Sequence, residues 1–185
     1  MGLNYTDGCV NFRDVGEYLE LIMGDSSFPV GRLYRGGSID YVKNPEEIGL
    51  PNSVISLRGS LDYEEFDIDY YHFPMDNKIE KYHTDKKEVR RWLNGIIRLF
   101  EKPTLQYPVL VHCLSGKDRT GIVIAALLLI CGIDREAITE EYLLSEGEVD
   151  EVLIANAMDG LADLGAYFHK VDLKLVKDNL LGMNS

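Results

Sequence analysis

The chain of 185 residues is 45% hydrophobic, so it can bury a sizeable core, and its length suits one globular domain spanning residues 1–185. Its 31 acidic and 19 basic residues give a net charge of -12, which argues against nucleic-acid binding and against a polybasic membrane patch. The longest apolar run is too short to cross a bilayer, and the three Cys residues lack metal-ligand spacing. We therefore expect a reduced, cytoplasmic protein without stable membrane insertion.

The first half of the chain predicts a set of short strands. Segments 11–16 and 31–37 are expected to form two short strands with Gly-rich turns between and after them, and a hairpin-like excursion at 24–27. Segment 51–58 predicts a buried strand, and segment 70–77 predicts a further strand that runs into a Pro-containing loop.

The second half predicts helices around one more strand. Segment 86–101 has apolar residues at helical spacing with Lys and Arg on the other face, which indicates a crossover helix. An apolar run ending at His112 predicts a strand buried on both faces, and the apolar residues 122–131 predict a central, buried helix. Three later helices are expected: one after the N-cap candidate Asp134, one near 151–164 and one near 167–181. This alternation predicts an α/β fold with a central, mostly parallel sheet and helices on both faces.

Cys113 lies on the turn between the buried strand and the buried helix, whose start is bracketed by Gly116 and Gly121. Loop amides that converge before a helix, together with the partial positive charge of its N-terminus, favour an anion such as phosphate and also a thiolate. A free Cys has a pKa of about 8.5, which falls to roughly 3.5–7.5 at a helix N-terminus beside basic residues. We therefore expect Cys113 to be ionised and nucleophilic at neutral pH.

Three neighbours of Cys113 have side chains suited to phosphoryl chemistry. Arg119 can hold two phosphoryl oxygens bidentately, which suits a planar guanidinium better than a Lys. Thr120 can place a hydroxyl near the sulfur and stabilise it when it leaves a phospho-cysteine intermediate, and His112 can fix the loop through its ring nitrogens. The other loop residues expected to bind phosphate are Leu114, Ser115, Gly116, Lys117 and Asp118.

The segment His112-Cys113-x-x-Gly116-Lys117-Asp118-Arg119-Thr120-Gly121 resembles the signature loop of the cysteine-dependent protein tyrosine phosphatase superfamily. Asn11-Phe-Arg-Asp-Val-Gly16 and Gly31-Arg-Leu-Tyr-Arg-Gly-Gly37 resemble the N-terminal signature of a bacterial-type branch, so the resemblance spans most of the chain. It implies a phosphatase fold of the dual-specificity type. It also implies hydrolysis of phosphotyrosine in proteins, possible dual specificity, a phospho-cysteine intermediate, and no metal or organic cofactor.

The reaction needs a general acid, because a tyrosyl or alkyl oxygen leaves poorly unless it is protonated. Asp76 is the first candidate, since dual-specificity phosphatases place their acid on a loop just after the corresponding strand. Asp118 is the rival, because some bacterial members with a Gly-Lys-Asp-Arg ending use the loop Asp instead. His72 and His83 lie nearby in sequence and are expected to be packing or surface residues.

The Lys117-Asp118 pair also resembles members that act on phosphoinositides, where an extra Lys can pair with a second phosphate. The alternative function is therefore a phosphoinositide or inositol phosphate phosphatase. A phospho-binding module without turnover is a further alternative, which the presence of both Cys113 and Arg119 disfavours.

Basic residues in the first half have two interpretations. Arg13, Arg32 and Arg35 can form a rim that guides a phosphorylated substrate, or they can be solvated or internally paired, which we favour. Arg58 can support the site together with the segment 64–65, which is Glu-Glu, or it can make a surface salt bridge.

Other features bear on modification and location. Gly2 fits a loose N-myristoylation pattern without basic residues beside it, so we do not expect modification there. A low-pKa thiolate at Cys113 is oxidisable, with Cys9 or Cys131 as possible resolving partners. A monomer is favoured, and the sequence leaves open whether the protein is delivered to a host.

Overall fold

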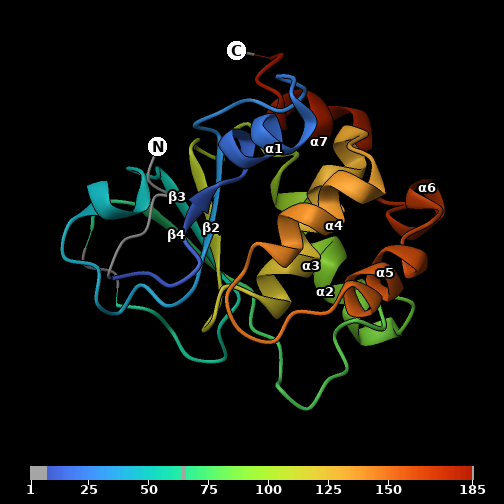
Figure 1. The fold of residues 1–185 in the computed structure, drawn as a ribbon, viewed down its shortest axis with the longest axis horizontal. Coiled ribbons are helices and arrows are strands. Elements are labelled where there is room, and N and C mark those ends of the chain that lie inside the picture. Colours follow the sequence, from blue (N-terminus) through green and yellow to red (C-terminus); the bar gives the residue numbers. More distant parts are fainter. Residues whose placement is uncertain (1–7, 64–65, 185) are drawn as a thin grey trace.

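The computed structural model describes residues 8–63 and 66–184, and its centre is a five-stranded sheet with the order β1-β2-β5-β3-β4 (Figure 1). Strands β2, β5, β3 and β4 pair in parallel, and only the short β1 pairs antiparallel, with β2. The predicted α/β fold with a mostly parallel sheet is therefore confirmed. The strands are β1 Arg13–Asp14, β2 Leu33–Gly36, β3 Ser53–Ser56, β4 Asp69–His72 and β5 Val109–His112.

The register places the carboxyl end of β5 between the carboxyl ends of its two neighbours, β2 and β3. His112, the last residue of β5, lies opposite Gly36 of β2 on one side and Ser56 of β3 on the other. All four residues of β5 are buried, as predicted from its continuous apolar run. Because ligands in such sheets bind beyond the carboxyl ends of the strands, the loop after His112 lies where a site is expected.

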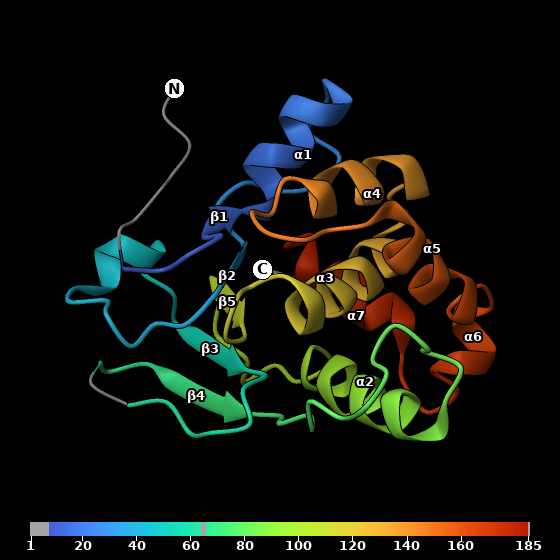
Figure 2. The same ribbon diagram turned by 60° about the horizontal axis from the view of Figure 1, so that its bottom comes forward.

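The α-helices of the described chain lie together on one face of the sheet (Figure 2). The central helix α3 is buried nearly all round, as its continuous apolar sequence predicts, and α1, α2, α4, α5 and α7 pack around it in one core cluster. The helix predicted near 167–181 corresponds to α7, which begins only at Leu173, and a separate short helix, α6, lies between α5 and α7. The helices are α1 Val15–Met23, α2 Lys87–Leu99, α3 Asp118–Cys131, α4 Arg135–Leu143, α5 Glu151–Gly160, α6 Leu164–Tyr167 and α7 Leu173–Leu180.

The second face of the sheet is covered differently from the prediction of helices on both faces. There a smaller apolar cluster forms between the sheet, the N-terminal segment and the 3-10 helix η1, Pro45–Ile48, with Phe12, Ile48, Val54 and Leu110 as members. Among the described residues, this short 3-10 helix is the only helical element that contributes to the second cluster. The α-helical content therefore lies almost wholly on the face that supports the loop after β5.

The segment between β1 and β2 contains a helix, α1, so the predicted hairpin-like excursion there is wrong. Asp14 caps α1, since its carboxylate accepts from the amides of Gly16 (2.9 Å) and Glu17 (3.4 Å), and Gly24 ends it in the left-handed conformation. The segment predicted as strands and turns therefore holds a capped helix. Its buried residues Val15 and Leu19 join the main core.

Two predictions fall on residues outside the described ranges: modification at Gly2, and the support of Arg58 by segment 64–65. Within residues 8–63 and 66–184, none of the helices is both long enough and apolar enough to span a bilayer.

Candidate active site

Cys113 follows β5 directly and is almost completely buried, with a relative exposure of 1%. The loop after it packs closely on the end of β2. Gly116 has a φ of +68°, and a Cβ built on it would lie 2.4 Å from the carbonyl carbon of Gly36 and 2.5 Å from the nitrogen of Gly37. Only glycine can therefore occupy this position without displacing the loop from the neighbouring strand.

Three consecutive carbonyl oxygens of the loop accept hydrogen bonds from outside it. In a trans peptide the carbonyl and the following N–H point in opposite directions. The amides of Ser115, Gly116 and Lys117 therefore point away from these donors, and no described residue accepts a hydrogen bond from them. Such a run of free amides before a helix is a binding site for an oxyanion. The three bonds are Ser38 N to Leu114 O (2.9 Å), Asn11 Nδ2 to Ser115 O (2.8 Å) and Arg35 Nη2 to Gly116 O (3.0 Å).

Arg119 lies in the first turn of α3 and is 8% exposed. Its Nη1 donates to the carbonyl oxygen of Leu57, just beyond β3, at 2.8 Å, and this is its one hydrogen-bond partner among the described residues. The bond holds the guanidinium at the carboxyl end of the strands, where Cys113 also lies, and leaves the other N–H donors of Arg119 for a ligand.

Thr120 is fully buried beside Arg119, and its hydroxyl has no hydrogen-bond partner within the described chain. A buried hydroxyl without a partner costs about 1–3 kcal/mol. Such a group is explained if a reacting group supplies the missing partner.

His112 is held at both ring nitrogens. Nδ1 lies 3.1 Å from the carbonyl oxygen of Gly37, and Nε2 lies 2.7 Å from the carboxylate of Asp62. Because a carbonyl oxygen only accepts, Nδ1 donates to Gly37, and Nε2 faces the carboxylate of Asp62. Burial raises the pKa of Asp62, but the hydrogen bond and charge of His112 and the charge of Arg58 outweigh it and hold that pKa below its usual range. His112 is thus held in one orientation directly before Cys113.

Asp62 is a supporting residue that the sequence analysis missed. It also pairs with Arg58 (3.2 Å), which in turn pairs with Asp40 (2.6 Å). The i,i+4 spacing of Arg58 and Asp62 was a weak signal of the pair. Nothing in the sequence indicated the contact with His112, which lies 50 residues away. The predicted support by Arg58 thus runs through Asp62 in the described part of the chain.

A buried ion cluster lies behind the loop. Both oxygens of Glu141 are engaged, one by Arg13 Nε (2.8 Å) and the other by Arg35 Nη1 (2.5 Å). Burial works to raise the pKa of Glu141, but the two guanidinium groups hold it below its usual range. Burial and the neighbouring charge of Arg13 lower the pKa of Arg35 to about 10. Since Arg35 also donates to Gly116, the cluster fixes the loop from α4.

These contacts decide between the two interpretations of the N-terminal arginines. Arg13 and Arg35 are internally paired, and Arg32 donates to the backbone oxygens of Asn179 and Leu180 while its guanidinium lies 3.7 Å from the ring centroid of Tyr107. The favoured prediction of internal pairing is confirmed, and the basic rim is wrong.

Asp118 and Asp76, the two candidate acids, have different surroundings. Asp118 is half-buried in the first turn of α3, and its Oδ1 accepts from the hydroxyl of Tyr82 at 2.6 Å. The Tyr82 hydroxyl also lies 2.6 Å from that of Tyr142, and burial together with Asp118 raises the pKa of Tyr82. Asp76 is exposed on the loop after β4, where its carboxylate accepts from the amide of Lys78 at 2.9 Å.

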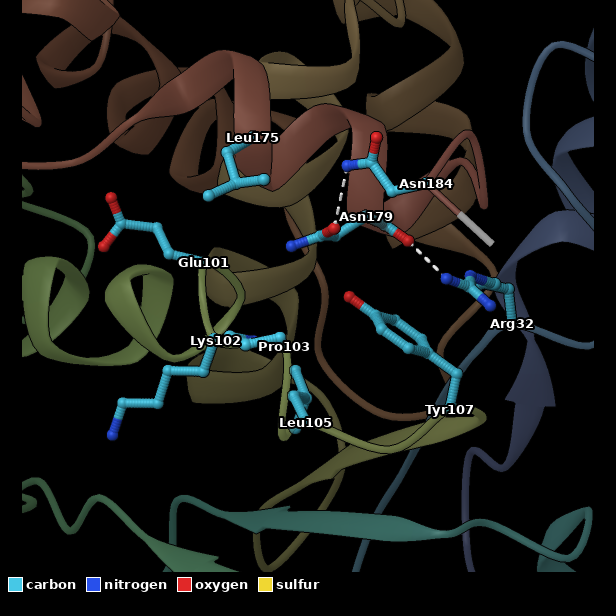
Figure 3. A pocket seen from close by; sticks show the side chains of 9 residues that line it. All are labelled: Arg32, Glu101, Lys102, Pro103, Leu105, Tyr107, Leu175, Asn179 and Asn184. Carbon is cyan, nitrogen blue, oxygen red and sulfur yellow. Dashed lines mark hydrogen bonds between the residues drawn. The ribbon is translucent and has the colours of Figure 1, made fainter.

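A hollow of about 530 Å³ lies beside the amino ends of β2 and β5, around Tyr107, Arg32 and Asn179 (Figure 3). Tyr107 precedes β5, whereas Cys113 follows it, so this hollow is separated from the loop by the length of the strand. Arg32, directly before β2, donates to the carbonyl oxygen of Asn179 and so ties the C-terminal segment to the sheet, while Asn184 donates to Asn179 within that segment. We assign it a structural role.

Comparison with known proteins identifies the family. A model described as the tyrosine phosphatase family matches residues 5–176, which is most of the chain. The chain belongs to the tyrosine phosphatase family. A segment of 45 residues is also 49% identical to the triple specificity protein phosphatase PtpB of Mycobacterium tuberculosis. That segment is 24% of this chain and only 16% of the length of PtpB.

Solved structures show that this tyrosine phosphatase family member has the fold of dual-specificity phosphatases. The core catalytic domain of the PP-IP phosphatase SIW14 from S. cerevisiae matches with a TM-score of 0.55 at 18% identity, covering 76% of this chain and 91% of that one. DUSP15 matches with a TM-score of 0.53 at 17% identity, covering 78% and 91%. At these identities the likeness concerns the fold alone.

The structure separates the two predicted resolving cysteines of this family member. Cys131 ends α3, whose 14 residues span about 20 Å, so it is too far from Cys113 to form a disulfide. Cys9 is buried with its sulfur 3.6 Å from the carbonyl oxygen of Gly37, and burial raises its pKa to about 12. A role for Cys9 stays a prediction.

Proposed function

We propose that the chain hydrolyses phosphotyrosine in proteins through a phospho-cysteine intermediate. The observation that carries this proposal is the conformation of the loop. Its carbonyl oxygens are turned outward, so the amides of Ser115, Gly116 and Lys117 are free, and the same loop bears Cys113 and Arg119. Free amides and a guanidinium on one loop are complementary to the three non-bridging oxygens of a phosphoryl group.

The proposed reaction has two steps. Cys113 Sγ attacks phosphorus in line, the bond from phosphorus to the tyrosyl oxygen breaks, and the general acid protonates that oxygen as it leaves. A water molecule then attacks the phospho-cysteine, the same carboxylate accepts its proton, and the thiolate leaves. Arg119 and the loop amides bind the non-bridging oxygens in both steps, as phosphoryl transfer requires.

Two buried neighbours support the thiolate in this proposal. His112, held by Asp62 and Gly37, fixes the start of the loop that carries the sulfur. The hydroxyl of Thr120 supplies a hydrogen bond to the sulfur when it leaves the intermediate, which gives the unpartnered buried hydroxyl its acceptor.

Asp118 is our proposed general acid. Its carboxylate lies in the loop itself and is positioned by Tyr82, and its second oxygen makes no hydrogen bond or ion pair with the described residues. Asp76, the first candidate from the sequence, instead holds the turn of its own exposed loop through Lys78. Positioning matters for an acid because a proton is transferred only within hydrogen-bond reach of the leaving oxygen.

The test is hydrolysis of para-nitrophenyl phosphate by variants of the full chain. We expect Cys113→Ser to abolish turnover, and full activity of this variant would contradict the mechanism. A pH-rate profile should lose its basic limb in Asp118→Asn and keep it in Asp76→Asn. The reverse result would assign the acid to Asp76 and leave the nucleophile unchanged.

One observation favours the alternative of a phosphoinositide or inositol phosphate substrate. The ammonium of Lys117 lies 3.6 Å from the position of a Cβ on Gly147, beside the loop after α4, and has no carboxylate partner among the described residues. An unpaired cation beside the phosphate loop suits a second phosphate on the same substrate.

Initial rates on phosphotyrosine peptides, phosphoserine peptides and phosphoinositides distinguish these substrates. If Lys117 binds a second phosphate, Lys117→Met should lower kcat/KM for phosphoinositides by about tenfold, the loss of one charge-assisted hydrogen bond, and leave phosphotyrosine peptides unaffected. Equal losses on both substrates would assign Lys117 to the loop alone. Absence of turnover by the wild type on all three would instead support a binding module.

A further inference from the structure

A second hollow, of about 620 Å³, lies beside helix α2, away from the loop of Cys113. Its described lining contains no Asp or Glu, although the chain as a whole carries 31 acidic and 19 basic residues. Six lining residues have basic side chains: Lys87, Arg90, Arg91 and Arg98 from α2, and His169 and Lys170 from the segment between α6 and α7.

The spacing of the basic residues places them on a single face of α2. Positions 90 and 91 follow position 87 by three and four residues, and position 98 follows position 91 by seven, while the opposite face is buried in the main core. Like charges three or four positions apart destabilise a helix. Such an arrangement, without carboxylates in the lining, concentrates positive potential in a concave surface of an acidic protein.

Hydrogen bonds hold one wall of the hollow in place, and most of its basic side chains are unpaired among the described residues. Arg90 donates to the carbonyl oxygens of Ala166 and Tyr167 and lies over the ring of Tyr167, and Asn94 also donates to the Tyr167 oxygen at 3.2 Å. These bonds fix α2 against α6 and hold the shape of the hollow. The four other Lys and Arg side chains of the lining make no hydrogen bond or ion pair with any residue in the described ranges: Lys87, Arg91, Arg98 and Lys170.

The lining selects among anionic ligands. Arg91 and Arg98 are seven residues apart, a rise of about 10 Å along α2, so a ligand that contacts both must carry more than one anionic group. Guanidinium groups bind phosphate bidentately, and a hollow of this volume fits a small molecule. The lining has no Phe, Tyr or Trp ring on which a nucleotide base could stack, and none of the exposed large apolar side chains that membrane insertion requires.

We propose that this hollow binds a soluble oligophosphate, a small molecule with several phosphate groups and no aromatic base. The proposal does not depend on the phosphatase activity, since none of its residues belongs to the loop of Cys113. The free Arg91 and Arg98 provide the bidentate contacts, and Lys87 and Lys170 contribute charge at the rim.

Titration calorimetry on the full chain at 0.15 M salt tests the proposal, with inorganic tripolyphosphate and inositol hexakisphosphate as separate probes. We expect at least one probe to bind the wild type. In Arg91→Ala/Arg98→Ala the Kd should rise by about tenfold or more, since charge-assisted hydrogen bonds are lost. The probe that binds more tightly identifies whether the phosphates come from a linear chain or a ring.

Matched controls separate this hollow from general charge and from the loop. Lys87→Ala/Lys170→Ala should weaken binding, whereas Lys43→Ala/Lys102→Ala, which removes the same charge from exposed sites elsewhere, should change Kd less than about twofold. Arg119→Ala should retain binding. The proposal is overturned if neither probe binds, if both double Lys variants lose the same amount of affinity, or if Arg119→Ala alone abolishes binding.

Discussion

At the scale of the residue, the position of the proposed acid depends on a hydroxyl from a distant loop. Tyr82 is 36 residues from Asp118, yet it donates to that carboxylate at 2.6 Å and also contacts the hydroxyl of Tyr142. Neither Tyr82 nor Tyr142 belongs to the loop that binds the substrate's phosphate. Their effect on the reaction is through Asp118, which makes Tyr82 a positioning residue.

Tyr82→Phe should therefore lower kcat by about tenfold, because the carboxylate loses its fixed orientation, and should change KM little. The loss should be larger on phenyl phosphate than on para-nitrophenyl phosphate, since a poor leaving group depends more on the acid. Steady-state kinetics on both esters measures this. Tyr41→Phe, at an exposed tyrosine, is the control, and equal losses on the two esters would show that Tyr82 acts on stability alone.

At the scale of the element, two junctions determine whether the loop keeps its shape. The first is the contact of Gly116 with the end of β2, where no Cβ fits. The second is the start of α1, where Asp14 caps the helix and also accepts from the amide of Gly31 at 2.6 Å, so that it ties β1, α1 and the approach to β2 together.

Gly116→Ala should lower kcat by about a hundredfold, because displacing the loop by about 1 Å misplaces the reacting groups. The chain offers a matched control. Gly24 has a φ of +72° and nothing within 4 Å of a Cβ, so Gly24→Ala bears only the backbone cost, about 1–2 kcal/mol. Urea unfolding should show a loss of stability for both variants. Steady-state kinetics should show a loss of kcat for Gly116→Ala alone. A fully active Gly116→Ala would contradict the close packing.

Asp14→Ala should reduce the free energy of unfolding by about 1–2 kcal/mol through loss of the cap. Asp14→Asn should recover only part of this, because its one amide oxygen can replace Oδ1 at the cap, whereas its NH2 group takes the place of Oδ2, which accepts from Gly31. It also removes an ionised group that is costly to bury, since burial raises the pKa of the Asp14 carboxyl. Urea unfolding at neutral pH distinguishes the two. If Asn is as damaging as Ala, the charge matters more than the cap.

The sequence predicted best the elements whose own pattern of apolar residues is sufficient to define them. Strand β5 and helix α3 are buried on all sides, so their continuous apolar sequence was sufficient. Helix α1 was missed because its first two residues, Val15 and Gly16, are weak helix formers, and only Asp14 marked its cap. The loop of Cys113 was predictable because its residues are contiguous.

At the scale of the whole molecule, the supports of the loop come from parts of the chain that no local pattern connects. Glu141 lies 128 residues from Arg13 and 106 from Arg35, and Asp62 lies 50 from His112. Each of these residues is an ordinary charged residue in its own segment. Only the folded chain shows that Glu141 and Asp62 belong to the site.

The cluster around Glu141 predicts acid lability. Its folded pKa lies below the ordinary value of 4.5, so the unfolded state takes up the proton first as the pH falls. The stabilisation is thus complete above pH 4.5 and is lost as the pH falls through the folded pKa. Asp62 acts in the same direction below 3.8. Urea unfolding between pH 3 and 8 should show this fall.

Glu141→Gln should lower the free energy of unfolding at neutral pH by about 3–5 kcal/mol, since it leaves two buried guanidinium groups without their counter-ion. Its stability should also depend less on pH than that of the wild type. The exposed Glu136→Gln on the same helix is the control. A variant with an unchanged pH dependence would show that other carboxyl groups cause the acid lability.

Asn11 links the beginning and the end of the chain at the loop. Its side chain donates to Ser115 O at 2.8 Å and accepts from the amide of Glu146 at 2.7 Å. During synthesis from the N-terminus, Cys113 emerges from the ribosome well before Glu141 and Glu146 do. The loop therefore gains its last supports only when the C-terminal third has been translated, and a chain truncated before α4 carries the nucleophile without a formed phosphate site.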